Sequence, residues 1–165
     1  MSLTSANFVY KHNTGTIYGY ISSIGLQKIL LYQEGSAKPY LLHERPNILL
    51  GRLLTALFDR YFSGIPELFD QVPLDISSGT EFQKRIWNAL REIPWGNTCT
   101  YAELANRAGF LKKYARAIGQ ALRTNPIPII IPCHRVLCAD HSLGGFSAGL
   151  EWKKKLLQIE HYIEK

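Results

Sequence analysis

The spacing of apolar residues predicts a small sheet and a helix in the first half of the chain. Residues 16–23 and 26–32 are rich in β-branched, tyrosine and leucine side chains, and a short turn separates them, which predicts two paired strands. A linker with Pro39 and Pro46 follows. From Pro46, which suits the first position of a helix, apolar residues recur every three or four positions up to Gly64. That period predicts an amphipathic helix.

Two capping boxes mark helix starts in the second half. Thr80 is followed three residues later by Gln83, and Thr100 by Glu103. In this pattern each of the two side chains caps the backbone amide of the other residue. Apolar positions follow both boxes at helical spacing, and Gly109 suits the end of the second helix. We therefore expect two short helices in this part of the chain.

A third helix is predicted over residues 112–123, directly after a tight turn. On a helical wheel its basic polar face comprises Lys112, Lys113, Arg116, Gln120 and Arg123, and its apolar face comprises Tyr114, Ala115, Ile118, Ala121 and Leu122. A helix, a short turn and a second helix with such a face form the arrangement of a helix-turn-helix, whose second helix can lie in a DNA groove. Two surface helices with a solvated charged face are the alternative.

The composition is that of an ordinary globular protein, with 165 residues, 46% hydrophobic and 19% charged. It excludes a disordered or fibrous chain. The longest apolar run, residues 127–133, has seven residues including two prolines and is too short to cross a bilayer. The N-terminus has no basic segment followed by an apolar core, so it does not resemble a signal peptide. We expect an intracellular protein.

The positive charge is confined to the second half of the chain. Residues 1–80 carry six Lys or Arg and six Asp or Glu, whereas residues 81–165 carry thirteen and seven. The whole net charge of +6 therefore belongs to residues 81–165. A one-sided basic balance is typical of a protein that binds a polyanion, most often nucleic acid. A merely solvated basic surface is the other interpretation.

The three cysteines, Cys99, Cys133 and Cys138, form an odd set that suits reduced thiols better than a disulfide framework. The isoleucines and prolines of residues 127–132 predict a buried, extended segment that ends at Cys133. His134 and Arg135 follow directly, and either could raise the thiolate fraction of a nucleophile. The alternatives are an inert buried thiol beside a core histidine, a cysteine protease, and a zinc site, for which no C-x-x-C pair exists.

The segment around Cys133 resembles the Pro-Cys-His-Arg signature of the methylated-DNA-protein-cysteine methyltransferases, the 6-O-alkylguanine-DNA alkyltransferases. Further motifs match in family order over residues 64–161: Thr80, Phe82, Gln83 and Trp87; Ile93, Pro94, Gly96, Thr98, Thr100 and Tyr101; Ala115 to Gly119; Asn125 and Pro126; Ser147, Gly149 and Leu150. The resemblance implies an α/β (α+β) protein. It places a small ribonuclease H-like domain at residues 1–77 and a helical, winged-helix-like domain with the helix-turn-helix at residues 78–165.

The activity that the resemblance implies is DNA repair by direct reversal. After base flipping, the alkyl group of O6-alkylguanine moves irreversibly to the protein's own cysteine, so each molecule acts once. O4-alkylthymine is a further candidate substrate. A non-enzymatic binder of the alkyltransferase-like kind and a helix-turn-helix regulator are the competing interpretations. The expected location is cytoplasmic, or nuclear in a eukaryotic source.

Four catalytic residues follow from the same resemblance. Cys133 is the acceptor, and His134 deprotonates it through a water molecule. Glu160 orients the histidine, and Tyr101 donates a proton toward N3 of the departing guanine. The expected DNA-binding residues are Thr100, Lys113, Arg116, Ala117, Gly119, Gln120 and Arg123, with Arg116 filling the vacated base stack. The expected pocket residues are Asn125, Val136, Ser147, Ala148 and Gly149.

Three departures from the family pattern change these expectations. The turn before the third helix is one residue longer than the common one, which leaves the tilt of that helix open. Phe146 and Ala148 replace a common tyrosine and glycine and should narrow the pocket. Residues 1–80 contain no cysteine, so we expect no zinc and no other cofactor. The expected partner is double-stranded DNA, bound through its minor groove by a monomer, with no membrane involved; cooperative assembly on DNA is left open.

Overall fold

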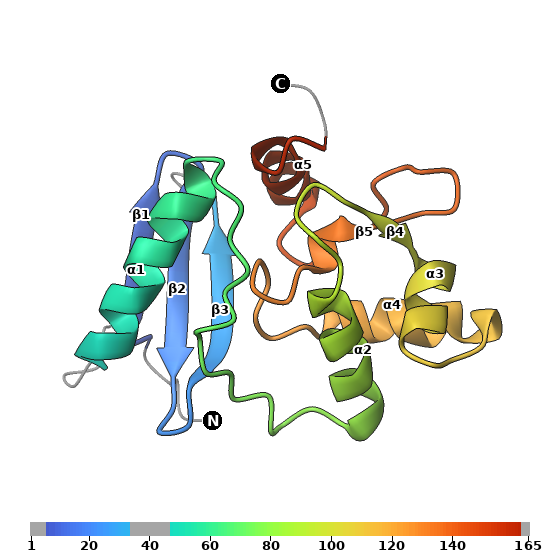
Figure 1. The fold of residues 1–165 in the computed structure, drawn as a ribbon, viewed down its shortest axis with the longest axis horizontal. Helices are drawn as coiled ribbons and strands as arrows, with labels where there is room; N and C mark the ends of the chain where they lie inside the picture. Colours follow the sequence, from blue (N-terminus) through green and yellow to red (C-terminus); the bar gives the residue numbers. More distant parts are fainter. Residues whose placement is uncertain (1–5, 34–46, 163–165) are drawn as a thin grey trace. The chain divides into compact units, whose positions relative to one another are not determined.

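The computed structural model describes residues 6–33 and 47–162 of the chain (Figure 1). The predicted linker with Pro39 and Pro46 lies outside the described residues. The chain divides into two compact units, Met1–Ile76 and Ser77–Lys165. None of the described helices is long and apolar enough to span a bilayer.

A three-stranded antiparallel sheet forms the first unit, with the order β1-β2-β3. Its strands are β1 (Phe8–His12), β2 (Gly15–Ile21) and β3 (Leu26–Tyr32). The predicted pairing of the second and third strands is confirmed, although β2 ends at Ile21 rather than at residue 23. Strand β1 was not predicted, because five residues give too short an alternation to distinguish a strand from a loop.

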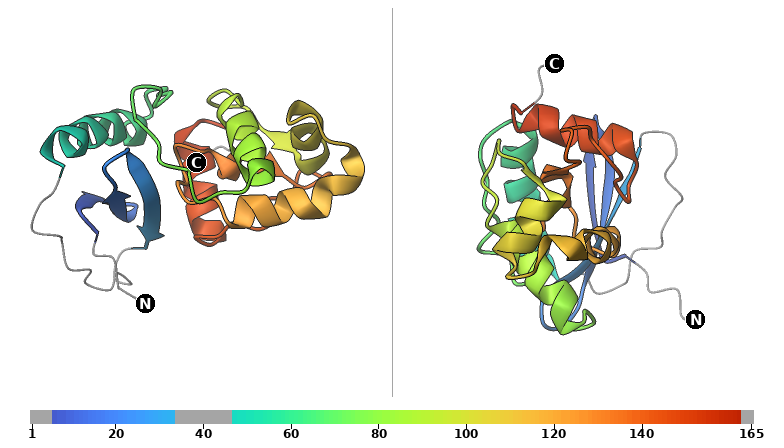
Figure 2. Two further views of the ribbon diagram at one scale, coloured as in Figure 1. Left: turned by 90° about the horizontal axis from the view of Figure 1, so that it is seen from below. Right: turned by 90° about the vertical axis from the view of Figure 1, so that its right-hand side faces the viewer.

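Helix α1 (Ile48–Phe62) lies along one face of this sheet (Figure 2). It begins later than predicted, because the side chain of Asn47 accepts a hydrogen bond from the amide of Leu50 at 3.1 Å and so caps the helix. The apolar stripe of the helix packs on the sheet through Phe58, whose ring centroid lies 5.4 Å from that of Tyr10. The predicted amphipathic helix is thereby confirmed.

The second unit is mainly helical. Its elements in chain order are α2 (Glu81–Arg91), β4 (Cys99–Thr100), α3 (Tyr101–Arg107), the 3-10 helix η1 (Lys112–Tyr114), α4 (Ala115–Arg123), the 3-10 helix η2 (Cys133–Arg135), β5 (Val136–Leu137) and α5 (Leu150–Ile159). Both capping boxes, Thr80 with Gln83 and Thr100 with Glu103, are present as predicted. The parallel pair of β4 and β5 brings the start of α3 beside the residues that follow η2.

Helices α3 and α4 form the helix-turn-helix, with a different start to its second helix. The predicted helix over residues 112–123 begins as η1, and only residues 115–123 are α-helical. Tyr114 was expected on the apolar face, which is wrong: it stands at the position before α4, makes no side-chain capping bond there and is 42% exposed. The longer turn is fixed from α2, where Arg85 donates to the carbonyl of Ala108 at 2.8 Å and stacks on the Phe110 ring at 4.3 Å.

The isoleucine-rich segment before Cys133 is buried as predicted, but the expectation of an extended path is wrong. The chain turns there: the amide of Ile131 donates to the carbonyl of Ile127 at 2.9 Å, and Ile129 adopts a left-handed φ of 76°. The prolines lack the amides that a strand ladder needs, so local bonds replace it. The side chain of Asn125 starts the turn by accepting from the amide of Ile127 at 3.0 Å.

Candidate active site

The thiol of Cys133 is held at the start of η2 by an amide side chain. Asn125, just beyond α4, donates through Nδ2 to Sγ at 3.0 Å and to the carbonyl of Ile131 at 2.7 Å. The amide of Cys133 donates to the same carbonyl at 2.8 Å. The thiol residue is only 4% exposed. The turn before η2 and the end of α4 therefore fix the direction of the sulfur together.

His134 and Arg135 share one buried carboxylate on the last helix. Nε2 of His134 lies 2.7 Å from Oε1 of Glu160, which directly follows α5. Arg135 donates to both carboxylate oxygens, through Nε at 2.8 Å and Nη2 at 3.0 Å. Nη1 of Arg135 donates to the carbonyl of Ile93 at 2.5 Å. All three side chains are buried, so the network is shielded from water.

The charges of this network set the protonation state and the tautomer of His134. Burial raises the pKa of the Glu160 carboxyl, but His134 and Arg135 outweigh burial and hold that pKa well below its usual range. Burial lowers the pKa of His134, although the carboxylate opposes this effect. The imidazole is therefore neutral at neutral pH. Because an ionised carboxylate can only accept, Nε2 carries the ring proton, and Nδ1 is the basic nitrogen.

The thiol rests in its protonated form. Burial raises the pKa of Cys133 to about 11, while the hydrogen bond from Asn125 and the charge of Lys153 lower it. A thiol in this state is a weak nucleophile at neutral pH. The site therefore combines a shielded, protonated thiol with a neutral imidazole on the next residue.

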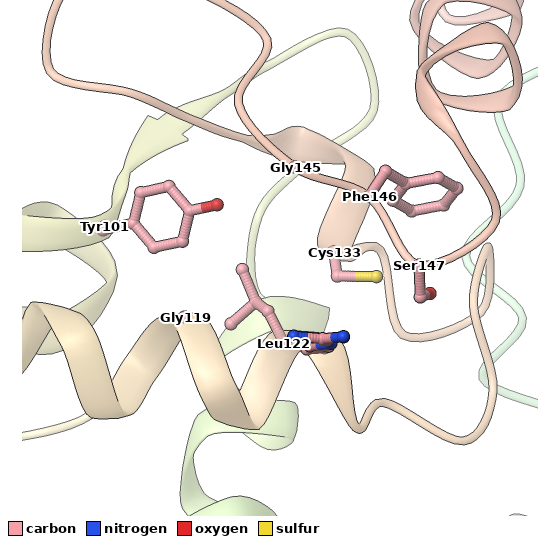
Figure 3. Close-up of a pocket in the computed structure, with 8 residues that line it drawn as sticks. Tyr101, Gly119, Leu122, Cys133, Gly145, Phe146 and Ser147 are labelled. Carbon is pink, nitrogen blue, oxygen red and sulfur yellow. The ribbon is translucent and has the colours of Figure 1, made fainter.

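A pocket of about 390 Å³ opens beside the thiol (Figure 3). Its lining residues are Tyr101, Gly119, Leu122, Arg123, Cys133, Gly145, Phe146 and Ser147. Tyr101 comes from the start of α3, and its hydroxyl points into the pocket from the side opposite Ser147 (Figure 3). Burial, and then the charges of Cys138 and Cys133, raise the pKa of Tyr101, so the phenol stays protonated and can donate.

The expected DNA-binding residues differ in how far they are exposed to solvent. Lys113, Arg116, Ala117, Gln120 and Arg123 are exposed along η1 and α4, and Gly119 and Thr100 are partly buried. Gly119 faces the pocket, because a Cβ atom there would lie 3.8 Å from Cε1 of Tyr101. Arg123 is exposed and also lines the pocket, so the basic face of α4 reaches the pocket rim.

The expected pocket residues do not all line the pocket. Ser147 does, and Asn125 lies behind the thiol. Val136 is fully buried in β5, Ala148 is partly buried, and neither contributes to the lining. Gly149 caps α5 with a φ of 92°, a left-handed conformation that favours glycine.

Lys153 is a site residue that the sequence reasoning missed. It is fully buried, and Nζ donates to the carbonyl of Val136 at 2.6 Å and to that of Leu143. The signal was present in the sequence: residues 153, 156, 157 and 160 lie on one helical stripe, and the middle two are leucines. A lysine and a glutamate on an apolar stripe indicate buried charges with partners.

Within residues 6–33 and 47–162, no three His, Cys, Asp or Glu side chains lie close enough together to hold a metal ion. Cys99 and Cys133 are buried free thiols, and Cys138 is a partly buried one. Burial raises the pKa of Cys99 to about 11, so this thiol is protonated at neutral pH.

Comparison with known proteins gives a consistent result. The family model of the "6-O-methylguanine DNA methyltransferase, DNA binding domain" matches residues 81–162. A methylated-DNA-protein-cysteine methyltransferase of Haemophilus influenzae is 47% identical over 125 residues, which cover 74% of this chain and 69% of that protein. The protein of the same name from Methanosarcina acetivorans is 50% identical over 102 residues, 62% of this chain and 64% of that protein.

Solved structures agree over most of the chain. The crystal structure of Mycobacterium tuberculosis OGT in complex with DNA superposes with a TM-score of 0.78 at 33% identity, covering 92% of this chain and 90% of that one. The O6-methylguanine-DNA methyltransferase of Pyrococcus kodakaraensis gives a TM-score of 0.67 at 25% identity over 92% and 96%. The mixed α/β architecture described above is thus shared with these structures.

Proposed function

Because the chain belongs to the family of methylated-DNA-protein-cysteine methyltransferases, enzymes of direct-reversal DNA repair, we propose that Cys133 accepts an alkyl group from O6 of guanine in DNA. The observation that carries this assignment is the buried thiol at the pocket, followed directly by a neutral histidine that a buried carboxylate orients. DNA is the partner, as in the complex of the Mycobacterium tuberculosis protein.

The proposed reaction is a single displacement at the alkyl carbon. Nδ1 of His134 takes the thiol proton through a water molecule, and the resulting imidazolium is stabilised by Glu160. Sγ of Cys133 bonds to the alkyl carbon as the bond from that carbon to O6 breaks, and the electron pair of the broken bond passes into the guanine. Tyr101 donates a proton toward N3, so neutral guanine leaves. The imidazolium of His134 then releases its proton to solvent and Tyr101 takes one up, which restores both side chains.

Access to the alkylated base requires that it leave the duplex. Extrusion of a nucleotide costs a few kcal/mol of unstacking and unpairing. In the proposal α4 lies in the minor groove, where the small side chain of Ala117 fits, and Arg116 fills the space that the base vacates. The minor groove presents a degenerate pattern of donors and acceptors, so this mode of binding has low sequence selectivity.

The proposed acceptor domain, residues 78–165, contains all of these groups. Its product is a thioether on Cys133, which none of the surrounding side chains can cleave. Each molecule therefore repairs one lesion. We propose that it acts as a monomer and without a cofactor. Bacterial and archaeal relatives of the same name support a cytoplasmic location.

Mass spectrometry of the reacted protein tests the assignment directly. Cleavage after Lys and Arg places the three cysteines on separate peptides: residues 92–107 with Cys99, 124–135 with Cys133 and 136–153 with Cys138. After incubation with a duplex that contains O6-methylguanine, we expect one added methyl group on the 124–135 peptide and none on the other two. The methyl count should stop at one per molecule.

Matched variants define the controls. Cys133→Ser should bind the methylated duplex without taking up a methyl group, and Cys138→Ser should react like the wild type. If the wild-type protein binds the lesion preferentially but takes up no methyl group, the protein is a non-enzymatic lesion binder and not an enzyme. Binding that depends on sequence and ignores the lesion would indicate a helix-turn-helix regulator.

A further inference from the structure

The buried ammonium of Lys153 bridges two segments on either side of a loop. One of its acceptors is the carbonyl of Val136, the residue directly after η2, and the other is the carbonyl of Leu143. Between them the chain makes a closed turn, in which the amide of Cys138 donates to the carbonyl of Ser142 at 3.0 Å. Lys153 therefore closes the base of the loop over residues 136–143.

This loop leads directly into one wall of the pocket. Gly145, Phe146 and Ser147 follow Leu143 in the chain and line the pocket beside Cys133 (Figure 3). Gly144 adopts a left-handed φ of 62°, and a Cβ atom there would lie 2.8 Å from Sγ of Cys138. The wall thus starts directly after Leu143, whose carbonyl Lys153 anchors. At the next residue, Gly144, there is no room for a larger side chain.

The charge of Lys153 also reaches the thiol. It lowers the pKa of Cys133 against the effect of burial, and burial in turn lowers the pKa of Lys153 itself to about 8. The titratable or charged side chains around the thiol and its lysine are Tyr101 of α3, Arg123 of α4, His134 and Arg135 of η2, Cys138 after β5, and Lys153 with Glu160 at α5. Arg135 is engaged by Glu160, and among the described side chains Lys153 is the cation whose charge lowers the pKa of the thiol.

The hydrogen bonds to two carbonyls account for a donor at this position, but they do not require that the donor be charged. Taking an ammonium out of water is costly, and replacing buried charges by apolar side chains of similar volume is often neutral or stabilising. A methionine would fill the same space between α5 and the loop. The presence of a charge at this position therefore indicates a use for the charge.

We propose that Lys153 is a positioning residue for alkyl transfer: its ammonium anchors the loop that leads to Phe146 and Ser147 and supplies the positive charge that favours the Cys133 thiolate. This inference rests on the proposed function, because it assigns the lysine to the same reaction. It adds a cation to the thiol, histidine and glutamate already described. The charge matters most when the thiol proton leaves and a negative sulfur forms inside the protein.

The test compares pH profiles of Cys133 reactivity in variants of the full chain. Lys153→Met removes the charge and both hydrogen bonds at similar volume, and Lys153→Gln removes the charge but keeps a donor. Lys154→Met is the matched control, since Lys154 is the exposed neighbour on the same helix. Two reagents are used: iodoacetamide on the free protein, and the duplex with O6-methylguanine. Both are followed on the 124–135 peptide.

For both Lys153 variants we expect lower rates with each reagent below about pH 8, where the wild-type Lys153 is charged, and rates that approach those of the wild type above that pH. An opposite charge nearby lowers a pKa by about one unit or more, so the rate at about pH 7.5 should fall roughly tenfold. The Lys154→Met profile should match the wild type. Profiles of the Lys153 variants that coincide with the wild type would overturn the proposal, as would a rate lowered by one factor at every pH.

Circular dichroism and thermal melting check the fold of each variant. If neither Lys153 variant folds, the lysine acts as a stability residue and the proposal is overturned. The two reagents separate this proposal from the assigned function. A wild type that takes up no methyl group from DNA refutes the function, while the iodoacetamide profiles still decide the role of Lys153.

Discussion

Replacing Glu160 with glutamine removes the charge that holds two neighbouring side chains of the active site. The carboxylate lies 2.7 Å from Nε2 of His134 and accepts two hydrogen bonds from Arg135. Glutamine keeps one acceptor oxygen, but its NH₂ group is a donor and would face the N–H donors of His134 or Arg135. The buried guanidinium of Arg135 is then left without a counter-charge. Removing one partner of such a pair costs about 3–5 kcal/mol of unfolding free energy.

The same variant has a defined pH dependence. Because the pKa of Glu160 is far lower in the folded protein than in the unfolded chain, its carboxylate contributes fully to stability above the unfolded value of about 4.3. That contribution is lost as the pH falls toward the folded pKa. The difference in unfolding free energy between wild type and Glu160→Gln should therefore be largest near neutral pH and shrink below about pH 4.

Urea unfolding followed by tryptophan fluorescence measures this difference. All three tryptophans, Trp87, Trp95 and Trp152, belong to the second unit, so the signal reports on the part that holds the site. Glu151→Gln on the exposed face of the same helix is the control and should stay within about 0.5 kcal/mol of the wild type. Equal stabilities of wild type and Glu160→Gln, or a difference that does not change with pH, would refute the reasoning.

Three further predictions concern DNA binding and the thiol. Arg116→Ala should slow transfer from a duplex at least tenfold and leave transfer from the free alkylated base unchanged; equal losses in single-turnover rates on both substrates would exclude a role in the base stack. Lys113→Ala should weaken duplex binding evenly across sequences and reduce the slope of log affinity against log salt by about 0.9, the value for one phosphate contact, as measured by fluorescence anisotropy. An unchanged slope would remove Lys113 from the phosphate contacts. Asn125→Ala should lower the unfolding free energy by about 1–3 kcal/mol and slow the reaction of Cys133 with iodoacetamide, because the donor to Sγ is lost; a faster reaction would show that the amide shields the thiol.

Elements set by local sequence could be predicted, and those set by distant contacts could not. The capping boxes of α2 and α3 are short-range patterns, and both are present. Strand β1 depends on pairing with β2, which five residues of alternation do not reveal. The isoleucine-rich turn depends on the Asn125 side chain and on missing proline amides, so its β-branched composition pointed to the wrong conformation.

In the candidate site, too, features set by neighbouring residues could be predicted and those set by distant contacts could not. The adjacency of Cys133 and His134 is visible in the sequence, and so is the basic face of residues 112–123. The contact of His134 with Glu160, 26 residues along the chain, appears only when α5 packs on η2. The bonds of Lys153 to two carbonyls could not be predicted, since any backbone carbonyl can accept from a lysine.

The position of α5 in the chain has a consequence for the order in which the protein becomes active during synthesis. The helix-turn-helix and Cys133 leave the ribosome before Lys153 and Glu160 do. Until α5 docks, the thiol has a histidine without its orienting carboxylate and a loop without its anchor. A nascent chain that already presents its basic helix would therefore not yet react, and the single-use thiol would not be consumed before α5 has docked.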